Sequence, residues 1–139
     1  RAGRTGLDAS SVGDAPGDID RDRPLVLGGF SQGSMVAVEA VLSAGVRPAG
    51  LIILSGALVA RERWARLLRE HEELVRGLPV FQSHGLDDPI LPIAGARALG
   101  ALLEEHGARR EFTTFAGGHA IPAQAVEHAS AWLEQFLPS

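Results

Sequence analysis

Apolar residues along this chain form two alternating patterns. Short, nearly continuous apolar runs are typical of strands buried on both faces of a parallel sheet. They occur at 25–30 and 50–54, and two further strands, with two large apolar residues each, are predicted at 80–84 and 111–115. Apolar residues spaced three or four apart, with polar residues between them, are typical of amphipathic helices. This spacing predicts helices at 31–44, 61–76, 94–106 and 123–137.

Strands and helices therefore alternate four times. This order predicts an α/β fold, with a parallel sheet of about four strands flanked by helices on both faces. In the second helix, Leu74 and Val75 are expected on the buried face with Trp64. The inward stripe of the last helix is expected to be Val126, Ala129, Leu133 and Phe136. In such sheets, sites form where loops leave the carboxyl ends of the strands.

The first residues differ from the rest of the chain. Residues 1–24 hold four Gly, five Asp and four Arg, but only three large aliphatic side chains. Neither periodicity can be drawn through them. We expect residues 1–23 to be a polar arm or loop and residues 24–139 to be one α/β domain, because 139 residues suffice for one core and not for two.

Composition and charge exclude several classes of protein. The net charge is −4, with 13 Lys and Arg against 17 Asp and Glu, whereas nucleic-acid binders are usually basic. The densest apolar run, 51–54, is far too short to span a membrane, and no signal-peptide pattern is visible. Without cysteine there is no disulfide framework and no thiolate site. We therefore expect a cytoplasmic protein.

The first predicted strand passes directly into the first helix through Gly29-Phe30-Ser31-Gln32-Gly33. So tight a turn strains its central residue, and glycines two residues to either side let the backbones approach. The Ser31 hydroxyl would then be exposed at the strand tip as a nucleophile. In the alternative interpretation, this is a plain glycine-rich turn whose serine caps the helix.

A serine nucleophile needs a base, usually histidine. Four of the five histidines have simpler explanations as helix-surface, helix-end or turn residues: His71, His128, His106 and His84. His119 instead follows the fourth predicted strand in Ala116-Gly117-Gly118-His119. We expect His119 to be the base, against the alternative of an ordinary loop histidine.

The acid that orients the base is expected in the loop after the third strand. Asp87 and Asp88 compete there, and local physics does not choose between them. Asp88 precedes proline, which favours an extended loop, whereas Asp87 suits a turn that bonds its own backbone. With either residue the chain order is Ser, Asp, His, which is the order of one known class of hydrolases.

Three segments together resemble the phospholipase/carboxylesterase family of α/β-hydrolases, which includes the acyl-protein thioesterases. They are Gly28-Gly29-Phe30-Ser31-Gln32-Gly33, His84-Gly85-x-x-Asp88-Pro89-x-x-Pro92 and Gly117-Gly118-His119. The resemblance covers residues 24 to about 138. It implies that Ser31 is the nucleophile, His119 the base and Asp88 the acid, because the family aspartate lies four residues past the His-Gly histidine and directly before proline.

One departure from the family matters. The family nucleophile follows the fifth strand, whereas Ser31 follows the first predicted strand here, so the resemblance implies a truncated fold that lacks the N-terminal strands. Those strands normally supply one oxyanion donor, and the other would be the backbone N–H of Gln32. Losing one donor typically costs about 10²- to 10³-fold in kcat. The first strand would also have an open edge, so we expect a homo-oligomer, a dimer that covers it.

The expected reaction is hydrolysis of a small carboxylic ester, with a short- to medium-chain acyl group, through an acyl-enzyme and without metal or cofactor. The acyl pocket is expected to include Phe30, Ile90 and Leu91. A metal cluster of His84, Asp87, Asp88 and His119 is a weaker interpretation. Thioesters and lysophospholipids remain alternative substrates. An inactive or partner-dependent fragment of a split hydrolase, and a binding module, remain alternative functions.

Overall fold

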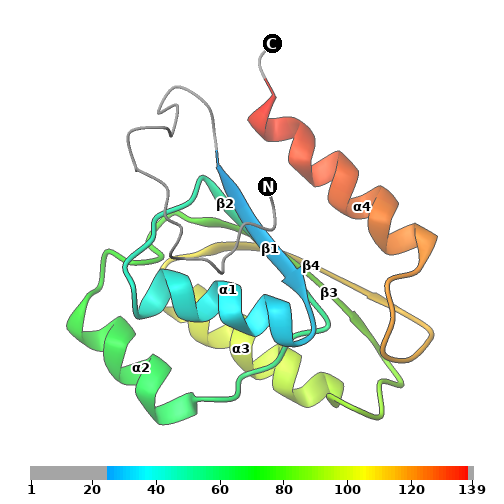
Figure 1. Cartoon of the computed structure of the whole chain (residues 1–139), viewed down its shortest axis with the longest axis horizontal. Coiled ribbons are helices and arrows are strands. Elements are labelled where there is room, and N and C mark those ends of the chain that lie inside the picture. The colour runs from blue at the N-terminus through cyan, green and yellow to red at the C-terminus, as the bar shows by residue number, and fades with distance from the viewer. Residues whose placement is uncertain (1–24, 138–139) are drawn as a thin grey trace, which may run out of the picture.

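The computed structural model describes residues 25–137, in which strands and α-helices alternate strictly (Figure 1). The strands are β1 (Val26–Phe30), β2 (Gly50–Leu54), β3 (Pro79–Gly85) and β4 (Arg109–Phe115). The helices are α1 (Gln32–Leu42), α2 (Arg61–Glu70), α3 (Ile93–Glu105) and α4 (Ala123–Leu133), followed by a 3-10 turn at Glu134–Phe136. Each predicted strand and helix is present. The predicted polar arm, residues 1–23, lies outside the described residues.

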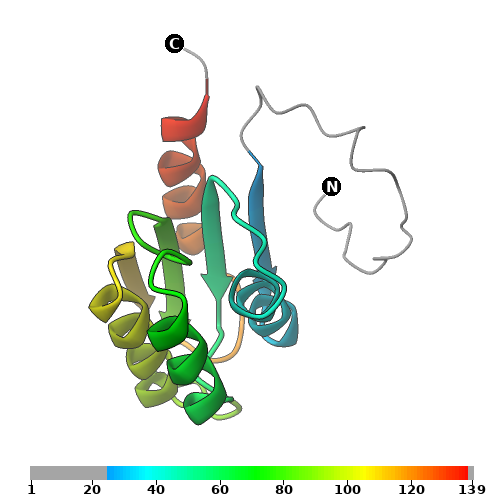
Figure 2. The same cartoon turned by 90° about the vertical axis from the view of Figure 1, so that its left-hand side faces the viewer.

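The four strands form one parallel sheet in the order β1-β2-β3-β4. Right-handed crossovers that step in one direction place consecutive helices on the same face. Helices α1, α2 and α3 accordingly cover one face, and α4 covers the other (Figure 2). The predicted α/β fold with helices on both faces is confirmed. All four carboxyl strand ends point to the same edge of the sheet.

The main core lies between the sheet and helices α1 to α3. Leu51 and Ile53 of β2 and Val80 of β3 are completely buried on this face. The helix side chains that cover them are Val38, Val41, Trp64, Leu68, Leu99 and Leu103. Burying each such side chain contributes about 1.5–3 kcal/mol. This packing makes the sheet a firm support for the loops at its carboxyl edge.

Helix α4 packs on the opposite face through aromatic rings. The Trp132 ring lies 5.8 Å from Phe81 of β3 and 5.1 Å from Phe136, centroid to centroid. Gly50 of β2 leaves room for the Trp132 and Phe136 rings, since a Cβ on Gly50 would come within 2.8 Å of both rings. Val126, predicted to face inward, is 51% exposed because the helix is rotated to bury Trp132. The other three predicted inward residues are partly buried.

Helix α2 ends at Glu70, although the pattern predicts a helix to residue 76. Segment 71–78 turns instead, because the Arg47 guanidinium takes up its main-chain carbonyls. The acceptors, at 2.8–3.1 Å, are Glu73, Leu74 and Arg76. Val75 is completely buried all the same. The prediction that Val75 lies in the core is confirmed, and the prediction that it lies in a helix is wrong.

Strand β1 lies at one end of the described sheet. It pairs on one side with β2, from Val26 opposite Gly50 to Phe30 opposite Leu54. Within residues 25–137 no strand lies on its other side. Among the described helices, none has both the length and the apolar character needed to cross a membrane.

Candidate active site

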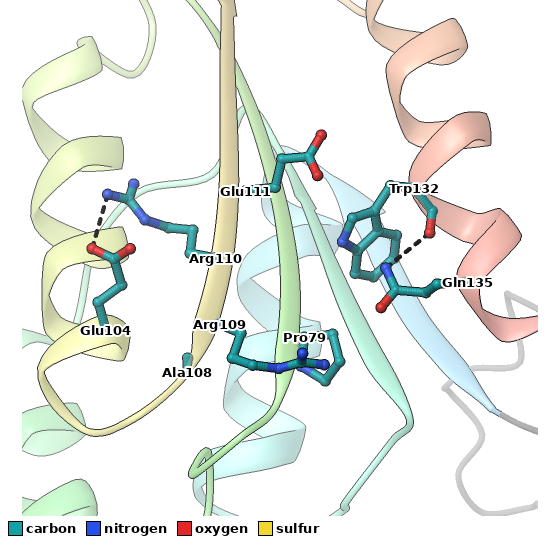
Figure 3. A pocket seen from close by; sticks show the side chains of 8 residues that line it. All are labelled: Pro79, Glu104, Ala108, Arg109, Arg110, Glu111, Trp132 and Gln135. Atoms are coloured by element: carbon teal, nitrogen blue, oxygen red, sulfur yellow. Dashed lines mark hydrogen bonds and ion pairs between the residues drawn. The ribbon is translucent and has the colours of Figure 1, made fainter.

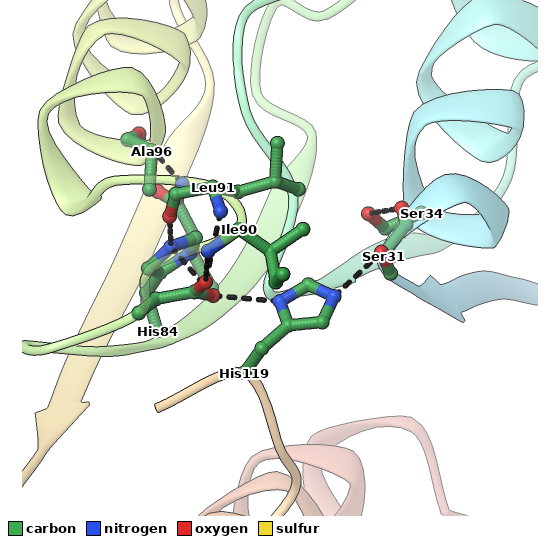
Figure 4. Close-up of polar contacts among 9 residues, drawn as sticks. Ser31, Ser34, His84, Ile90, Leu91, Ala96 and His119 are labelled. Atoms are coloured by element: carbon green, nitrogen blue, oxygen red, sulfur yellow. Dashed lines mark hydrogen bonds and ion pairs between the residues drawn. The ribbon is translucent and has the colours of Figure 1, made fainter. Parts of the chain in front are cut away.

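Three predicted site residues meet at the carboxyl edge of the sheet. Ser31 directly follows β1, Asp88 lies in the loop after β3, and His119 lies in the loop after β4 (Figure 4). These loops are far apart in sequence, but parallel strands deliver them to one edge. The fold therefore brings together the residues that the sequence proposed separately.

Two hydrogen bonds connect these side chains in series. The Ser31 hydroxyl lies 2.8 Å from His119 Nε2, and His119 Nδ1 lies 2.7 Å from Asp88 Oδ2. A carboxylate only accepts, so Nδ1 carries the ring proton and donates to Asp88. Nε2 is then free to accept the Ser31 proton. This is the protonation pattern that a general base requires.

The backbone of Ser31 is held in an unusual conformation, with φ 56° and ψ −121°. A positive φ in a residue other than glycine costs on the order of 1–3 kcal/mol. The turn is held by the Ser31 N–H, which donates to the Leu54 carbonyl at 2.8 Å. The Ser31 side chain makes no capping bond to α1, so it does not act as a helix cap. Its hydroxyl is directed at His119 instead.

The two glycines of the G-x-S-x-G motif have different roles. A Cβ on Gly29 would overlap the backbone of Gly33, so this turn admits only glycine there. Nothing among the described residues lies within 4 Å of a Cβ built on Gly33. The expected close approach of backbones therefore holds for Gly29. For Gly33, no described neighbour requires it.

Asp88 is buried, and its carboxylate is well supplied with donors. The side chain has no exposed surface. Oδ1 accepts the backbone N–H groups of Ile90 and Leu91, both at 2.8 Å, while Oδ2 accepts His119. Burial raises the pKa of Asp88, but the hydrogen bonds from Leu91, His119 and Ile90 together lower it below its usual value. The carboxylate is therefore kept ionised.

Asp87, the competing aspartate, is exposed. Its contribution is through the main chain, where its N–H donates to the Gly117 carbonyl at 2.9 Å. The Leu86 N–H donates likewise to the Phe115 carbonyl at 2.9 Å. Gly85 permits this approach, because a Cβ there would overlap the carbonyls of the loop that carries His119. The loop that carries Asp88 and the loop that carries His119 are thus tied together by backbone hydrogen bonds.

The remaining histidines lie away from the Ser31 hydroxyl. His71 and His128 are exposed, and His106 caps the end of α3. His84, expected to hydrogen-bond in the turn after β3, is completely buried within β3 and contacts the carbonyl of Leu91, in the loop that follows, at 2.6 Å. Within the described part of the chain, no three His, Asp, Glu or Cys residues are grouped so as to hold a metal ion.

The predicted pocket residues border the site to different degrees. The Phe30 ring lies 5.0 Å from the His119 ring, centroid to centroid. Ile90 is 65% exposed, and the nearby Ile121 is 41% exposed. Leu91 is partly buried. Its backbone N–H donates a hydrogen bond to the Asp88 carboxylate. The sequence did not indicate this main-chain role.

The Gln32 N–H is the oxyanion donor that the sequence predicts. Gln32 is the first residue of α1 and directly follows Ser31. Within residues 25–137, no backbone acceptor is found for this N–H. A helix N-terminus favours negative charge, because its first N–H groups point outward without helical partners.

A cavity of about 430 Å³ lies at the other end of the sheet (Figure 3). Its lining includes Pro79 and Arg109, which begin β3 and β4, together with Trp132. A second cavity, of about 650 Å³, is lined by the end of α1 and the segment after it, by Leu67 of α2 and by residues of the segment 71–76. Neither is lined by Ser31, Asp88 or His119. The hydrogen-bond geometry, and not the cavities, locates the candidate site.

The glycine geometry yields a matched pair of variants. We predict that Gly29→Ala lowers the free energy of unfolding by about 1–3 kcal/mol or more, because its methyl group overlaps the Gly33 backbone. Gly33→Ala should be neutral or stabilising by up to about 1 kcal/mol, because alanine favours helix. Urea unfolding followed by circular dichroism measures both. Equal effects of the two substitutions would contradict the assigned geometry.

Comparisons with known proteins agree with the motifs. A sequence model of the Phospholipase/Carboxylesterase family matches residues 12–137. Acyl-protein thioesterase 1 of Neurospora crassa is 33% identical over 121 residues, which are 86% of this chain and 49% of that protein. The chain thus spans about half the length of the curated relatives it matches.

Solved structures show the same fold. The crystal structure of esterase PE8 is 29% identical, with a TM-score of 0.69 over 81% of this chain and 50% of the esterase. Acyl-protein thioesterase 2 of Zea mays superposes with a TM-score of 0.76 over 94% of this chain and 62% of that chain; at 20% identity this shows the fold alone. With its strand-to-helix serine turn and its matched residues, the chain belongs to the phospholipase/carboxylesterase family of α/β-hydrolases.

Proposed function

We propose that this chain carries the catalytic centre of a serine hydrolase that cleaves small carboxylic esters. Ser31 is the nucleophile, His119 the base and Asp88 the acid. The main support is the unbroken series of contacts from the Ser31 hydroxyl through the imidazole to the Asp88 carboxylate. Membership of the family supports the same class of reaction. Because the chain spans about half of its relatives, the proposal rests on the site itself.

In the proposed acylation, His119 Nε2 takes the Ser31 proton as Oγ attacks the ester carbonyl carbon. Asp88 stabilises the imidazolium that forms and keeps Nδ1–H directed at itself. The carbonyl oxygen becomes negatively charged in the tetrahedral intermediate, and the Gln32 N–H at the start of α1 donates to it. The imidazolium then protonates the departing alcohol oxygen. An ester bond to Ser31 remains.

In the proposed deacylation, water replaces the alcohol. His119 Nε2 takes a proton from that water, whose oxygen attacks the acyl carbon. When the second intermediate collapses, the proton passes to the Ser31 oxygen and the carboxylic acid leaves. No residue beyond those of the acylation step is required. Exposed apolar side chains beside the site, Ile90 and Ile121, with the Phe30 ring, are suited to contact a short- to medium-chain acyl group.

A thioester is the alternative substrate. Acyl-protein thioesterase is the name of several of the similar proteins, and the same steps cleave a thioester with a thiol as the leaving group. Two oxyanion donors are usual in such sites, and losing one costs about 10²- to 10³-fold in kcat. We propose that a second donor comes from residues outside 25–137 or from a second copy of the chain. A chain inactive without that donor would be a partner-dependent fragment or a binding module.

The first test is hydrolysis of p-nitrophenyl butanoate, with the matched thioester as a second substrate. We predict turnover that falls on the order of 10³-fold or more in Ser31→Ala, because no other nucleophile is in place. Turnover by the Asp88→Asn variant should fall about 10²- to 10⁴-fold, because a neutral amide cannot stabilise the imidazolium as a carboxylate does. The ratio of the two kcat/KM values chooses between ester and thioester.

Asp87→Asn is the matched control, because it makes the same change one residue earlier on an exposed side chain. Its turnover should stay close to that of the unmodified chain. Equal rates with and without the Ser31 hydroxyl would remove Ser31 from the reaction. Equal losses in the two aspartate variants would remove the special role of Asp88.

We further propose that the chain forms a homodimer through β1, as expected from the sequence. Within residues 25–137 the outer edge of β1 has no strand beside it, and such an edge readily pairs with another chain. Light scattering over a range of concentrations should give twice the mass of one chain. A single-chain mass at every concentration would contradict the dimer. The cytoplasmic location expected from the sequence remains a prediction.

A further inference from the structure

His84 is a buried polar residue that the proposed reaction does not use. It is the sixth residue of the seven-residue strand β3, and its side chain has no exposed surface. On the same face of β3, Gln82 donates its side-chain N–H to the Ala96 carbonyl at the start of α3. His84 instead points to the loop that carries Asp88 (Figure 4).

The contacts of His84 fix which ring nitrogen carries its proton. Nε2 lies 2.6 Å from the Leu91 carbonyl oxygen. A carbonyl only accepts, so Nε2 carries the hydrogen and donates it. Nδ1 has no partner among the described residues. Burying a polar atom without a partner costs free energy, so the hydrogen bond from Nε2 offsets part of the cost of burying this ring.

The backbone of Leu91 is held on both sides of its Cα. Its N–H donates to Asp88 Oδ1 at 2.8 Å, and its carbonyl accepts His84 Nε2–H. The same Nε2 lies 3.4 Å from Asp88 Oδ2, the oxygen that faces His119. The donor edge of the ring thus supports the acid loop and also faces the carboxylate.

We propose that His84 is a positioning residue for the acid of the site. Its Nε2–H holds the Leu91 carbonyl, fixes the loop 88–91 around the Asp88 carboxylate, and so orients Oδ2 toward His119 Nδ1. His84 does not touch the substrate, and it acts through Asp88. This inference rests on the proposed function of Ser31, His119 and Asp88.

Two substitutions of His84 separate its hydrogen bond from its bulk. His84→Gln places a side-chain N–H at the same number of bonds from Cα as Nε2, so it can still donate to the Leu91 carbonyl. His84→Met fills the space without a donor. We predict that His84→Met lowers kcat for p-nitrophenyl butanoate on the order of 10²-fold with little change in KM, because a misplaced catalytic group costs about this much. His84→Gln should retain kcat within about 10-fold.

A double-substitution cycle tests whether His84 acts through Asp88. In the Asp88→Asn background the carboxylate is already absent, so His84→Met should cause little further loss of kcat. Phe81→Leu is the stability control, because Phe81 packs against Trp132 on the other face of the sheet. It should lower the melting temperature without lowering kcat. Two results would overturn the proposal. One is that His84→Met lowers kcat by the same factor in the Asp88→Asn background as in the unmodified chain. The other is that His84→Met has the same kcat as the unmodified chain.

A second measurement does not depend on turnover. The proton on His119 Nδ1 should give a low-field NMR signal, identified by its disappearance in His119→Ala. We predict that His84→Met removes or shifts this signal, whereas His84→Gln and Phe81→Leu keep it. An unchanged signal in folded His84→Met would overturn the proposal. If the unmodified chain shows the signal but no hydrolysis, the proposed function fails, and the positioning role is still decided by the signal.

Discussion

The hydrogen bond between His119 Nδ1 and Asp88 Oδ2 is the contact on which the rest of the site depends. It joins two residues that lie 31 positions apart in sequence, and at 2.7 Å it holds Nδ1 against the carboxylate. Because Nδ1 must donate, Nε2 must accept, and the acceptor faces the Ser31 hydroxyl at 2.8 Å. Without this bond the ring could rotate or exchange tautomers. The Ser31 hydroxyl would then lose the contact with the imidazole that we propose as its base.

A buried carboxylate is costly unless donors surround it. Asp88 has two backbone donors on one oxygen and His119 on the other, and these bonds lower its pKa despite burial. The two backbone donors come from the loop that follows the aspartate, so residues 88–91 themselves supply two of the hydrogen bonds that stabilise this carboxylate. The sheet determines where these residues meet. Its parallel strands bring three loops to one edge, and its core holds Ser31 in a conformation that an isolated chain would leave.

Alternation of apolar runs and amphipathic stripes was enough to predict the fold, because each pattern depends on residues close in sequence. The differences arise where distant contacts decide. Arg47 binds carbonyls after α2 and ends that helix early, and the Trp132–Phe81 contact sets the rotation of α4. The choice of Asp88 over Asp87 came from the family resemblance, since only burial in the folded chain separates two adjacent carboxylates. The contact from His84 to the acid loop likewise exists only in three dimensions.

The central claim is that Ser31 is activated by its neighbours and is not merely exposed. A fluorophosphonate reacts with an activated serine by forming a phosphorus–oxygen bond and releasing fluoride, and the modified peptide can be identified by mass. The account predicts one adduct, on the peptide that contains Ser31, formed far more slowly in a folded His119→Ala variant. An adduct on another residue, or labelling at an equal rate without the imidazole, would contradict it.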